Sequence, residues 1–312
     1  MTSALLFFTE LTQAPSKAQR ELLTLAARFD SATVALTGDI SEEATGIVGS
    51  YGIGRILQAP AGDGFQDHEV GVLDAAVQTV NPQIVLLAND SFHREVAARV
   101  AARREVGIIT DAIDVSADRT VTKDELAGAY TARVNPVADL VLVTVKPNSV
   151  EDAPAGGESA AVVEPLEVAA YASRLQVVGR EEKPASGRPS LGEARIVVSG
   201  GRGVDGDFSP VEDLADALGA AVGASRAATD AGWIDHDFQV GQTGTTVSPQ
   251  LYISAGISGA IQQKAGMQTS KYIVAVNKDE DAPIFEIADF GIIGDLKQIL
   301  PQAAEEIRRR QS

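Results

Sequence analysis

The segment from Leu251 to Asp279, LYISAGISGAIQQKAGMQTSKYIVAVNKD, constrains the fold more than any other part of the chain. It holds an apolar strand, a glycine-rich turn, the start of a helix and a second apolar strand in one short unit. Strands joined in this way lie parallel in a sheet. The turn also directs a helix N-terminus and several backbone N–H groups to one spot, which suits a phosphate or pyrophosphate.

The first half of the chain shows the same alternation, which predicts a parallel, doubly wound sheet. Four strands are expected at Ala4–Phe8, Thr33–Leu36, Ile84–Ala88 and Gly107–Ile109. The helices expected between them are Lys17–Phe29, His68–Val80 and Ser91–Arg104, the last with Ser91 as its cap. Later strand-like runs, at Tyr130–Val134, Leu140–Val145 and Ala160–Val163, extend the sheet or add an antiparallel edge.

A change in composition divides the chain of 312 residues. Glu181–Gly192, EEKPASGRPSLG, is typical of a linker between domains. We therefore expect an α/β protein of two domains, residues 1–185 and residues 186–312, each built on a mostly parallel doubly wound sheet. Beyond the linker, strands are expected at Arg195–Ser199, Ala220–Ala224, Gln250–Ser254, Tyr272–Val276 and Pro283–Ile287, with helices at Pro210–Leu218 and Gly294–Arg310.

Composition excludes several kinds of function. The chain has no cysteine and three well-separated histidines, so a metal site is not expected. A net charge of −17 argues against a nucleic-acid surface. No apolar run approaches the ~18 residues of a membrane span, and the N-terminus lacks a signal-peptide pattern, so a cytoplasmic location without membrane insertion is expected. No catalytic acid–base set is visible.

Gly201–Gly206 matches the G-x-G-x-x-G pattern of dinucleotide-binding turns. The next helix, however, is expected to open at Ser209, in a capping box with Glu212. The following strand ends at Ser225-Arg226 and not at an acidic residue. The pattern is therefore also consistent with a structural glycine turn.

Four further features are candidates for ligand binding. Arg226 either faces a ligand at the carboxyl edge of the sheet or is an ordinary surface arginine. Gln239–Thr246 is a glycine loop rich in hydroxyl and amide groups, or a surface turn. In the segment Ser254–Gly259, Ser258 is expected to cap a helix that binds an anion. Asp289 or Asp295 is expected to bind ribose hydroxyls, although Asp295 also suits a helix cap.

These blocks occur together in the order seen in electron-transfer flavoprotein alpha subunits, which the chain resembles. The blocks that carry the resemblance are SGGRG, ASRAATDAGW, QVGQTG, LYISAGISGAIQ, KYIVAVNKD and ADFGIIGDL, within Ser199–Leu296. The resemblance covers essentially all of the second domain, and the first domain agrees only in general character. It implies a Rossmann-like, FAD-binding second domain, and a heterodimer whose beta subunit carries AMP.

The resemblance also implies roles for individual residues. It places Arg226 near the isoalloxazine ring, the Thr243 hydroxyl at the ring nitrogen N5, and Asn277 at the adenosine end. The full set of FAD-contacting positions that it implies is Arg202, Ser225, Arg226, Val240, Gly241, Gln242, Thr243, Ser258, Gly259, Ala260, Ile261, Gln262, Gln263, Asn277, Asp295 and Leu296.

Gln263 departs from the pattern of the family, in which many members have a histidine near the N1/O2 edge of the ring. A histidine cation stabilises negative charge there, whereas a neutral amide only donates a hydrogen bond. The anionic semiquinone is therefore expected to be less favoured here, unless Arg226 compensates.

The function implied is an electron carrier without substrate chemistry of its own. It accepts electrons from flavin dehydrogenases, such as the acyl-CoA dehydrogenases of fatty acid β-oxidation, and passes them to a quinone oxidoreductase. Two alternatives stay open: a subunit of an NADH-oxidising, electron-bifurcating flavoprotein, and a nucleotide-binding interaction module without redox function.

Overall fold

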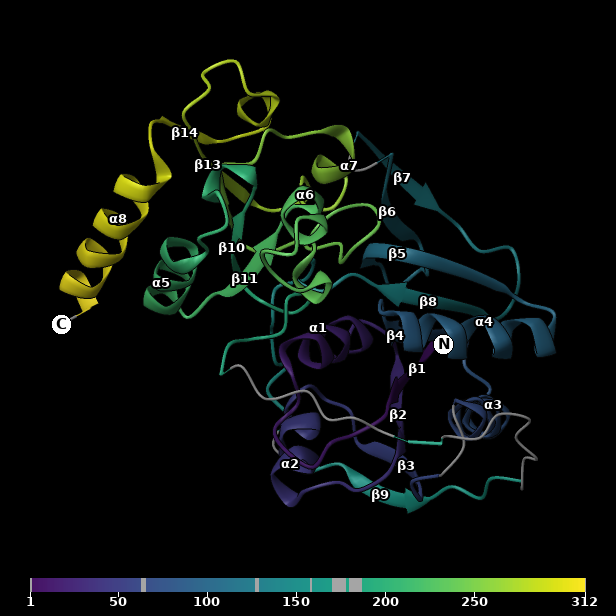
Figure 1. Ribbon diagram of the computed structural model, residues 1–312. Coiled ribbons are helices and arrows are strands. Elements are labelled where there is room, and N and C mark those ends of the chain that lie inside the picture. Colours follow the sequence, from purple (N-terminus) through teal and green to yellow (C-terminus); the bar gives the residue numbers. More distant parts are fainter. Residues whose placement is uncertain are drawn as a thin grey trace. The chain divides into compact units, whose positions relative to one another are not determined.

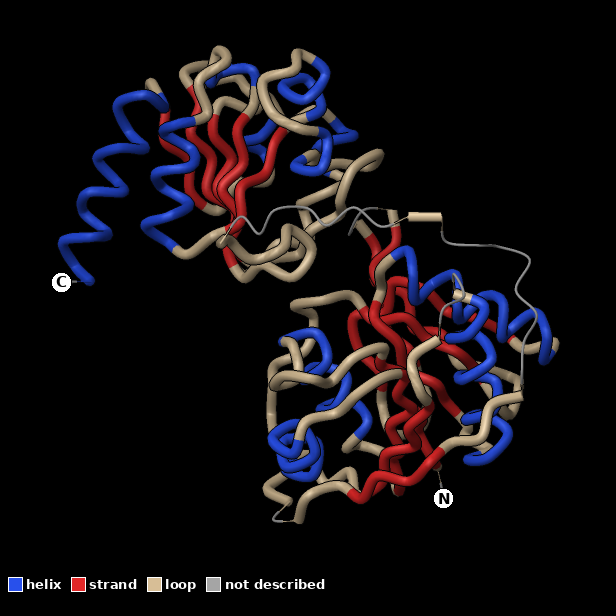
Figure 2. The backbone as a smooth tube through the Cα atoms, turned by 60° about the horizontal axis from the view of Figure 1, so that its bottom comes forward, coloured by secondary structure: helices blue, strands red, loops and turns tan. Residues whose placement is uncertain are grey.

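The computed structural model describes residues 2–62, 66–126, 129–157, 159–169, 178–179 and 187–311. The chain divides into two compact units, Met1–Asp124 with Thr131–Glu182 and Glu125–Tyr130 with Lys183–Ser312. The boundary expected between residues 185 and 186 lies outside the described residues, as does the first half of the expected linker. Within each unit, strands form a central sheet with helices beside it (Figures 1 and 2).

The sheet of the first unit has nine strands in the order β7-β6-β5-β8-β4-β1-β2-β3-β9. Six of its described pairings are parallel, and β5 pairs with β6 antiparallel. The strands are β1 (Ser3–Phe8), β2 (Ser31–Thr37), β3 (Arg55–Ala59), β4 (Ile84–Ala88), β5 (Gly107–Val115), β6 (Val121–Glu125), β7 (Tyr130–Val134), β8 (Val141–Val145) and β9 (Val162–Pro165).

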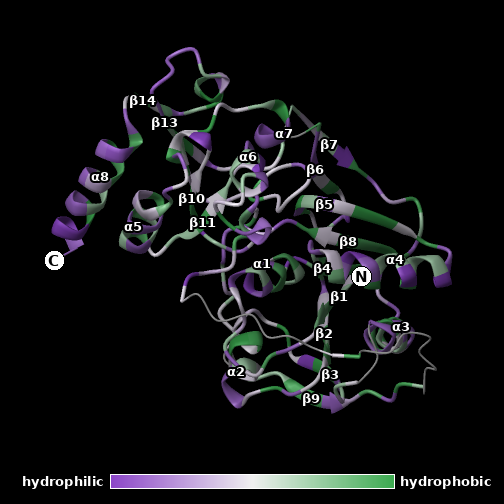
Figure 3. Cartoon of the chain, viewed as in Figure 1, coloured by the Kyte–Doolittle hydropathy of each residue, from purple (hydrophilic) through white to green (hydrophobic). Residues whose placement is uncertain are grey.

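Helices cover both faces of this sheet, as the doubly wound prediction requires. On one face α1 and α2 contribute to a buried core with side chains such as Leu22 and Val48. On the other face α3 and α4 contribute side chains such as Leu73 and Val96. The bounds are α1 (Lys17–Ala26), α2 (Glu42–Ser50), α3 (Asp67–Val80) and α4 (Ser91–Arg104). The hydropathy colours show apolar stretches along strands β5 and β8 (Figure 3).

The predicted strands of the first half are present, but the alternation missed α2 and β3. The sequence of α2, EEATGIVGS, contains two glycines and carries few apolar side chains, and β3, RILQA, has only two large apolar residues. The three later runs extend the sheet, as expected. β8 enters it between β4 and β5, β7 lies at one edge, and β9 pairs parallel with β3 at the other. The antiparallel pair involves β6, a strand that was not predicted.

Helix α4 is capped by Asp90 and not, as predicted, by Ser91. The Asp90 carboxylate accepts a hydrogen bond from the backbone N–H of His93 at 2.8 Å and contacts the His93 ring at 2.6 Å. Burial would raise the pKa of Asp90, but the hydrogen bonds and the charge of His93 outweigh burial and lower it. Ser91 is the first helical residue, one position too late to cap.

Replacing Asp90 with alanine is expected to lower the free energy of unfolding by about 1 kcal/mol, because the α4 cap is lost. The matched change Ser91→Ala is expected to cost less than ~0.5 kcal/mol. The pKa of Asp90 is lower in the folded state than in the unfolded state. The Asp90 carboxylate therefore contributes to the free energy of unfolding at pH values above its unfolded pKa, and this contribution is lost as the pH falls through its folded pKa. Urea unfolding at neutral and acidic pH measures both effects, and a larger loss for Ser91→Ala would contradict this cap assignment.

The sheet of the second unit has five strands in the order β11-β10-β12-β13-β14, all parallel. The strands are β10 (Ile196–Gly200), β11 (Ala221–Ala224), β12 (Leu251–Ala255), β13 (Tyr272–Asn277) and β14 (Phe290–Ile293). The helices are α5 (Ser209–Leu218), α6 (Arg226–Asp230), α7 (Ile261–Lys264) and α8 (Leu296–Gln311). Short 3-10 turns occur at η1 (Arg202–Val204), η2 (His236–Phe238) and η3 (Pro283–Glu286). The expected α/β class with mostly parallel sheets is thus confirmed.

Two local predictions in this unit are wrong. Pro283–Ile287 is not a strand: it forms the 3-10 turn η3, which a proline opens, and the last strand follows at β14. The capping box at Ser209 does not form either. Ser209 is already inside α5, Phe208 is the N-cap residue, and the Asp207 carboxylate accepts from Ser209.

The strand order reverses at β10, because β11 lies on one side of it and β12 on the other. Open α/β sheets bind ligands in the crevice beyond the carboxyl ends of the strands at such a switch point. On one face, α5 and α8 pack over the sheet, with Leu214 and Leu300 in the core. On the other face the core includes Val240 and Met267 from the loop segments that surround the crevice. No helix among the described residues is long and apolar enough to cross a membrane.

Candidate functional site

Two adjoining cavities lie beyond the carboxyl ends of the strands of the second unit. The larger has a volume of about 710 Å³ and the smaller about 320 Å³. Ligand pockets commonly span roughly 300–1,000 Å³. The two cavities share the lining residues Arg202, Gly203, Gly256, Asn277 and Lys278, so they form one elongated site along the sheet edge.

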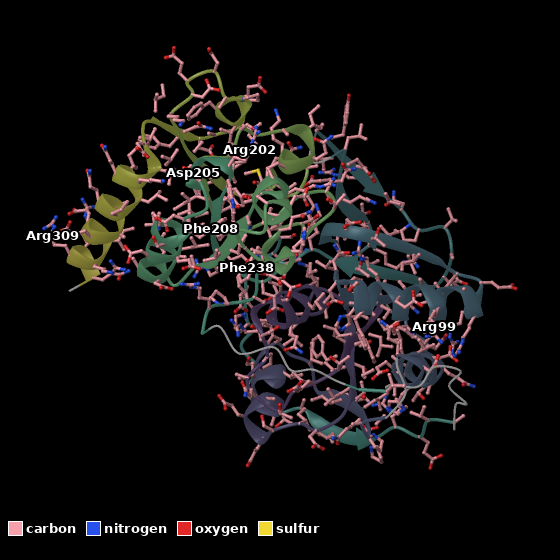
Figure 4. All side chains as sticks on the ribbon, in the orientation of Figure 1. Arg99, Arg202, Asp205, Phe208, Phe238 and Arg309 are labelled. Carbon is pink, nitrogen blue, oxygen red and sulfur yellow. The ribbon has the colours of Figure 1, made fainter. Side chains whose placement is uncertain are left out.

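The floor of this site is made by two turns that touch. The turn after β10 is joined to the turn after β12 by a hydrogen bond from Gly203 N to Gly256 O of 3.0 Å. A Cβ placed on Gly203 would lie 2.7 Å from the Cα of Gly256, which itself has a positive φ of 63°. The glycines therefore allow a backbone contact that no side chain permits. Arg202 and Asp205 extend from the β10 turn (Figure 4).

The turn after β12 presents unused backbone donors. The N–H groups of Ser258, Gly259, Ala260 and Ile261 donate to no residue that the structure describes. The expected helix is only the short turn α7, and its N-cap is Ala260, so Ser258 does not cap it. The case for an anion here therefore rests on these N–H groups and not on a helix dipole.

The loop from Gln239 to Thr245 forms the wall beside β11. Val240 N donates to Ala224 O at 2.9 Å, and Gln242 N donates to Gln262 O at 2.9 Å. The Gln239 amide donates to the Thr243 hydroxyl at 3.0 Å. Because that hydroxyl accepts from Gln239, its own hydrogen remains available to an acceptor in the cavity.

Ser225 and Arg226 differ in their surroundings, although they are adjacent. Ser225 is 8% exposed and lines the larger cavity, yet its hydroxyl has no hydrogen-bond partner among the described residues. An unpaired buried hydroxyl is costly, and a ligand that bonds to it removes that cost. The Arg226 side chain is exposed and pairs with Asp230 at 3.2 Å.

Gln263 lines the larger cavity and is 7% exposed. Its amide nitrogen donates to the Tyr252 hydroxyl at 3.0 Å. The sequence analysis expected the Gln263 amide to donate a hydrogen bond to a cofactor. In the structure its amide nitrogen is instead directed into the protein core.

Charged side chains line both cavities. In the smaller cavity, Arg202, Lys278 and Lys297 supply cations, and Asp205 and Asp295 supply carboxylates. In the larger cavity, Arg202, Arg226 and Lys278 supply cations, and Asp230 and Asp279 supply carboxylates. The Asp295 carboxylate accepts a hydrogen bond from Lys297 N at 2.9 Å. It therefore caps helix α8, which is one of the two roles that the sequence suggested for Asp295.

Asp289 does not belong to the site. It precedes β14, and its carboxylate accepts from Ile273 N at 2.8 Å, at the opposite edge of the sheet. The sequence placed Asp289 after the last strand only because it expected that strand at Pro283–Ile287.

The structure brings nearly all the predicted positions onto the two cavities. Those that line at least one cavity are Arg202, Ser225, Arg226, Val240, Gly241, Gln242, Thr243, Ser258, Ala260, Gln262, Gln263, Asn277, Asp295 and Leu296. Gly259 and Ile261 line neither. Gly259 packs its backbone against Ile284, and Ile261 is 77% exposed.

Two of the lining residues also hold the walls together. The Asn277 amide donates to Ile257 O at 3.0 Å, and Leu296 packs under Gly256. Residues that the sequence reasoning missed include Asp230, Lys278, Asp279 and Lys297. Lys278 and Asp279 directly follow Asn277, so the strand-end rule would have found them.

These observations fit a ligand with an anionic group at one end and a polar ring at the other. Free N–H groups and cations suit a pyrophosphate, and the hydroxyls of Ser225 and Thr243 suit a heteroaromatic ring. No group of three or more His, Asp or Glu side chains able to hold a metal occurs within the described part of the chain.

Comparison with known proteins identifies the family. Residues 6–171 match the family model of the electron transfer flavoprotein domain, and residues 190–268 match that of the electron transfer flavoprotein FAD-binding domain. The chain is 42% identical to the electron transfer flavoprotein subunit alpha of Mycobacterium leprae, over 99% of both chains. It is 49% identical to that of Pseudomonas aeruginosa, over 67% of this chain and 68% of the relative. The chain therefore belongs to the electron transfer flavoprotein alpha subunit family.

Proposed function

We propose that this chain is the FAD-holding subunit of a heterodimeric electron carrier. It accepts electrons from flavin dehydrogenases, such as the acyl-CoA dehydrogenases of fatty acid β-oxidation, and delivers them to a quinone oxidoreductase. The beta subunit that completes the carrier binds AMP, and the complex works in the cytoplasm. The observation that carries this proposal is the elongated double cavity at the switch point of the second sheet.

FAD supplies the electron-transfer chemistry when it is bound, and the chain supplies the binding groups and their electrostatics. The N–H groups of Ser258 and Ala260, with Arg202 and Lys278, would hold the pyrophosphate. Ser225 and Thr243 would bind the ring, and Asp295 would lie at the adenosine end. This division follows the lining residues, because Ser225 and Thr243 line only the larger cavity, whereas Asp295 and Lys297 line only the smaller one.

Arg226 would place a cation beside the ring at the cavity mouth. Its guanidinium pairs only with the exposed Asp230 among the described residues, and such surface pairs contribute little. It is therefore available to a ligand at small cost. A fixed positive charge at this place favours added electrons in the ring.

Anaerobic reduction of the full chain in complex with its beta partner tests the proposed function. An acyl-CoA dehydrogenase with its substrate is expected to bleach the flavin absorption of the complex, and a quinone oxidoreductase is expected to restore it. Direct reduction by NADH at a comparable rate would instead identify a bifurcating flavoprotein. A complex that takes up no FAD would identify a nucleotide-binding module without redox function.

Replacing Ser225 with alanine is expected to weaken FAD binding about fivefold, the effect of one hydrogen bond of ~1 kcal/mol. The stability of the FAD-free protein should not fall, because the removed hydroxyl has no partner there. Ser254→Ala is the matched control: its hydroxyl is also buried without a partner, but it lines neither cavity. FAD titration and thermal unfolding measure the two effects. Equal changes in FAD affinity for both variants would rule out a direct bond from Ser225.

A further inference from the structure

Tyr252 is a fully buried phenol directly beneath the proposed flavin cavity. It lies on the central strand β12, on the same face of the sheet as Ser254 and Ser199, whose backbones pair across β10 and β12. Burial raises the pKa of the phenol, against the opposing interactions with Ser199 and Gln263. Tyr252 is therefore neutral at physiological pH and can act only through hydrogen bonds.

Its hydroxyl fixes one end of the Gln263 side chain. The Gln263 amide nitrogen donates to the Tyr252 oxygen at 3.0 Å, and both side chains are buried. The amide oxygen lies on the other side, toward Gly241: it is 4.0 Å from where a Cβ on Gly241 would be. Gly241 and Gln263 line the same cavity. The nitrogen end of the amide thus faces the core and the carbonyl end faces the cavity wall.

We propose that Tyr252 is a positioning residue that holds the Gln263 amide with its carbonyl oxygen toward the flavin, and so lowers the reduction potential of the bound cofactor. The inference rests on the proposed function, because it requires FAD in this cavity. It reverses the donor role that the sequence alone assigned to Gln263.

The direction of the effect follows from electrostatics. Reduction adds electrons to the ring, and the negative end of a fixed carbonyl dipole disfavours the added charge. Without the phenol hydroxyl, the amide is free to turn its N–H groups toward the ring, which favours the reduced form. A hydrogen bond gained or lost at a buried charge is worth about 1.4 kcal/mol, or a tenfold change in relative affinity.

The test uses the full chain in complex with its beta partner and measures the midpoint potential of the bound FAD. Tyr252→Phe is expected to increase the affinity for reduced over oxidised flavin about tenfold, a rise of ~30 mV for a two-electron couple. Gln263→Met, which removes the carbonyl and keeps the volume, is expected to raise the potential in the same way. In the double variant the two effects should not add, because both act through one amide. Tyr272→Phe, at an exposed tyrosine of the same unit, is expected to change nothing.

Three results would overturn this role for Tyr252. The first is a lower or unchanged midpoint potential in Tyr252→Phe, and the second is an unchanged midpoint potential in Gln263→Met. The third is that Tyr252→Phe raises the midpoint potential equally in the wild type and in Gln263→Met. Should Tyr252→Phe not fold, the potential of Gln263→Met decides alone. Failure of the wild-type complex to bind FAD would instead refute the proposed function, which separates the two claims.

Discussion

Replacing Gly203 with alanine is expected to weaken FAD binding about 100-fold and to cost about 1–3 kcal/mol of stability in the second unit. The new Cβ would lie 2.7 Å from the Cα of Gly256 and 3.2 Å from Gly256 O. Both contacts are with backbone, so no side-chain movement relieves them, and the turns after β10 and β12 must separate. The separation displaces the free N–H groups of Ser258 and Ala260, and two lost hydrogen bonds of ~1.4 kcal/mol each account for the loss of affinity.

The control for this change is Gly192→Ala in the same unit. A Cβ at Gly192 would meet only the Thr245 side chain, at 4.0 Å, and its φ is not in the positive range. This variant is expected to bind FAD like the wild type. FAD titration into the cofactor-free complex measures the affinities. If Gly203→Ala keeps wild-type affinity, the contact between the two turns is not what shapes the site.

Replacing Arg202 with glutamine is expected to weaken FAD binding about 10- to 100-fold, which corresponds to ~1.5–3 kcal/mol for a lost charge-assisted bond. Arg202 is exposed and lines both cavities, and its side chain makes no hydrogen bond or ion pair with a described residue. Its loss is therefore not expected to alter the stability of the FAD-free protein. The wild-type affinity is expected to fall as salt is added, and the variant should respond less.

Lys271→Gln provides the matched loss of one cation. Lys271 precedes β13, at the amino edge of the sheet, and contacts the Tyr272 ring. It lies away from the cavities, so its removal is expected to leave FAD binding within about twofold of the wild type. An equal loss of affinity in both variants would show that general charge, and not the position of Arg202, attracts the cofactor.

The sequence predicted the parts of the fold that depend on neighbouring residues. Continuous apolar runs such as Ile84–Ala88 and Tyr272–Val276 became strands β4 and β13. The order of the strands depends on pairing between distant segments. The position of β8 between β4 and β5 therefore could not be read from its own residues. The N-cap of α4 could not be predicted from residue type, because Asp90 and Ser91 both have side chains that commonly cap helices. The backbone conformation makes Asp90 the N-cap and Ser91 the first helical residue.

In the candidate site, the positions of the residues could be predicted from the sequence, but the orientation of one key side chain could not. The positions near Arg202, Gln242 and Ser258 could be found because they follow strands whose carboxyl ends share one edge of the sheet. The direction of the Gln263 amide could not be found in this way. It is set by Tyr252, which is eleven residues earlier in the chain and reaches Gln263 from the core. Side-chain orientation inside a site depends on such contacts through space.

The most direct measurement of the central claim is the FAD content of the purified complex between the full chain and its beta partner. Absorption of the complex, with FAD released and quantified after denaturation, gives the number of flavins per chain. The account predicts one FAD per chain in the wild type and in Gly192→Ala, and a large loss of FAD in Gly203→Ala. Absence of FAD from the wild-type complex even after FAD is added, or full retention by Gly203→Ala, would contradict it.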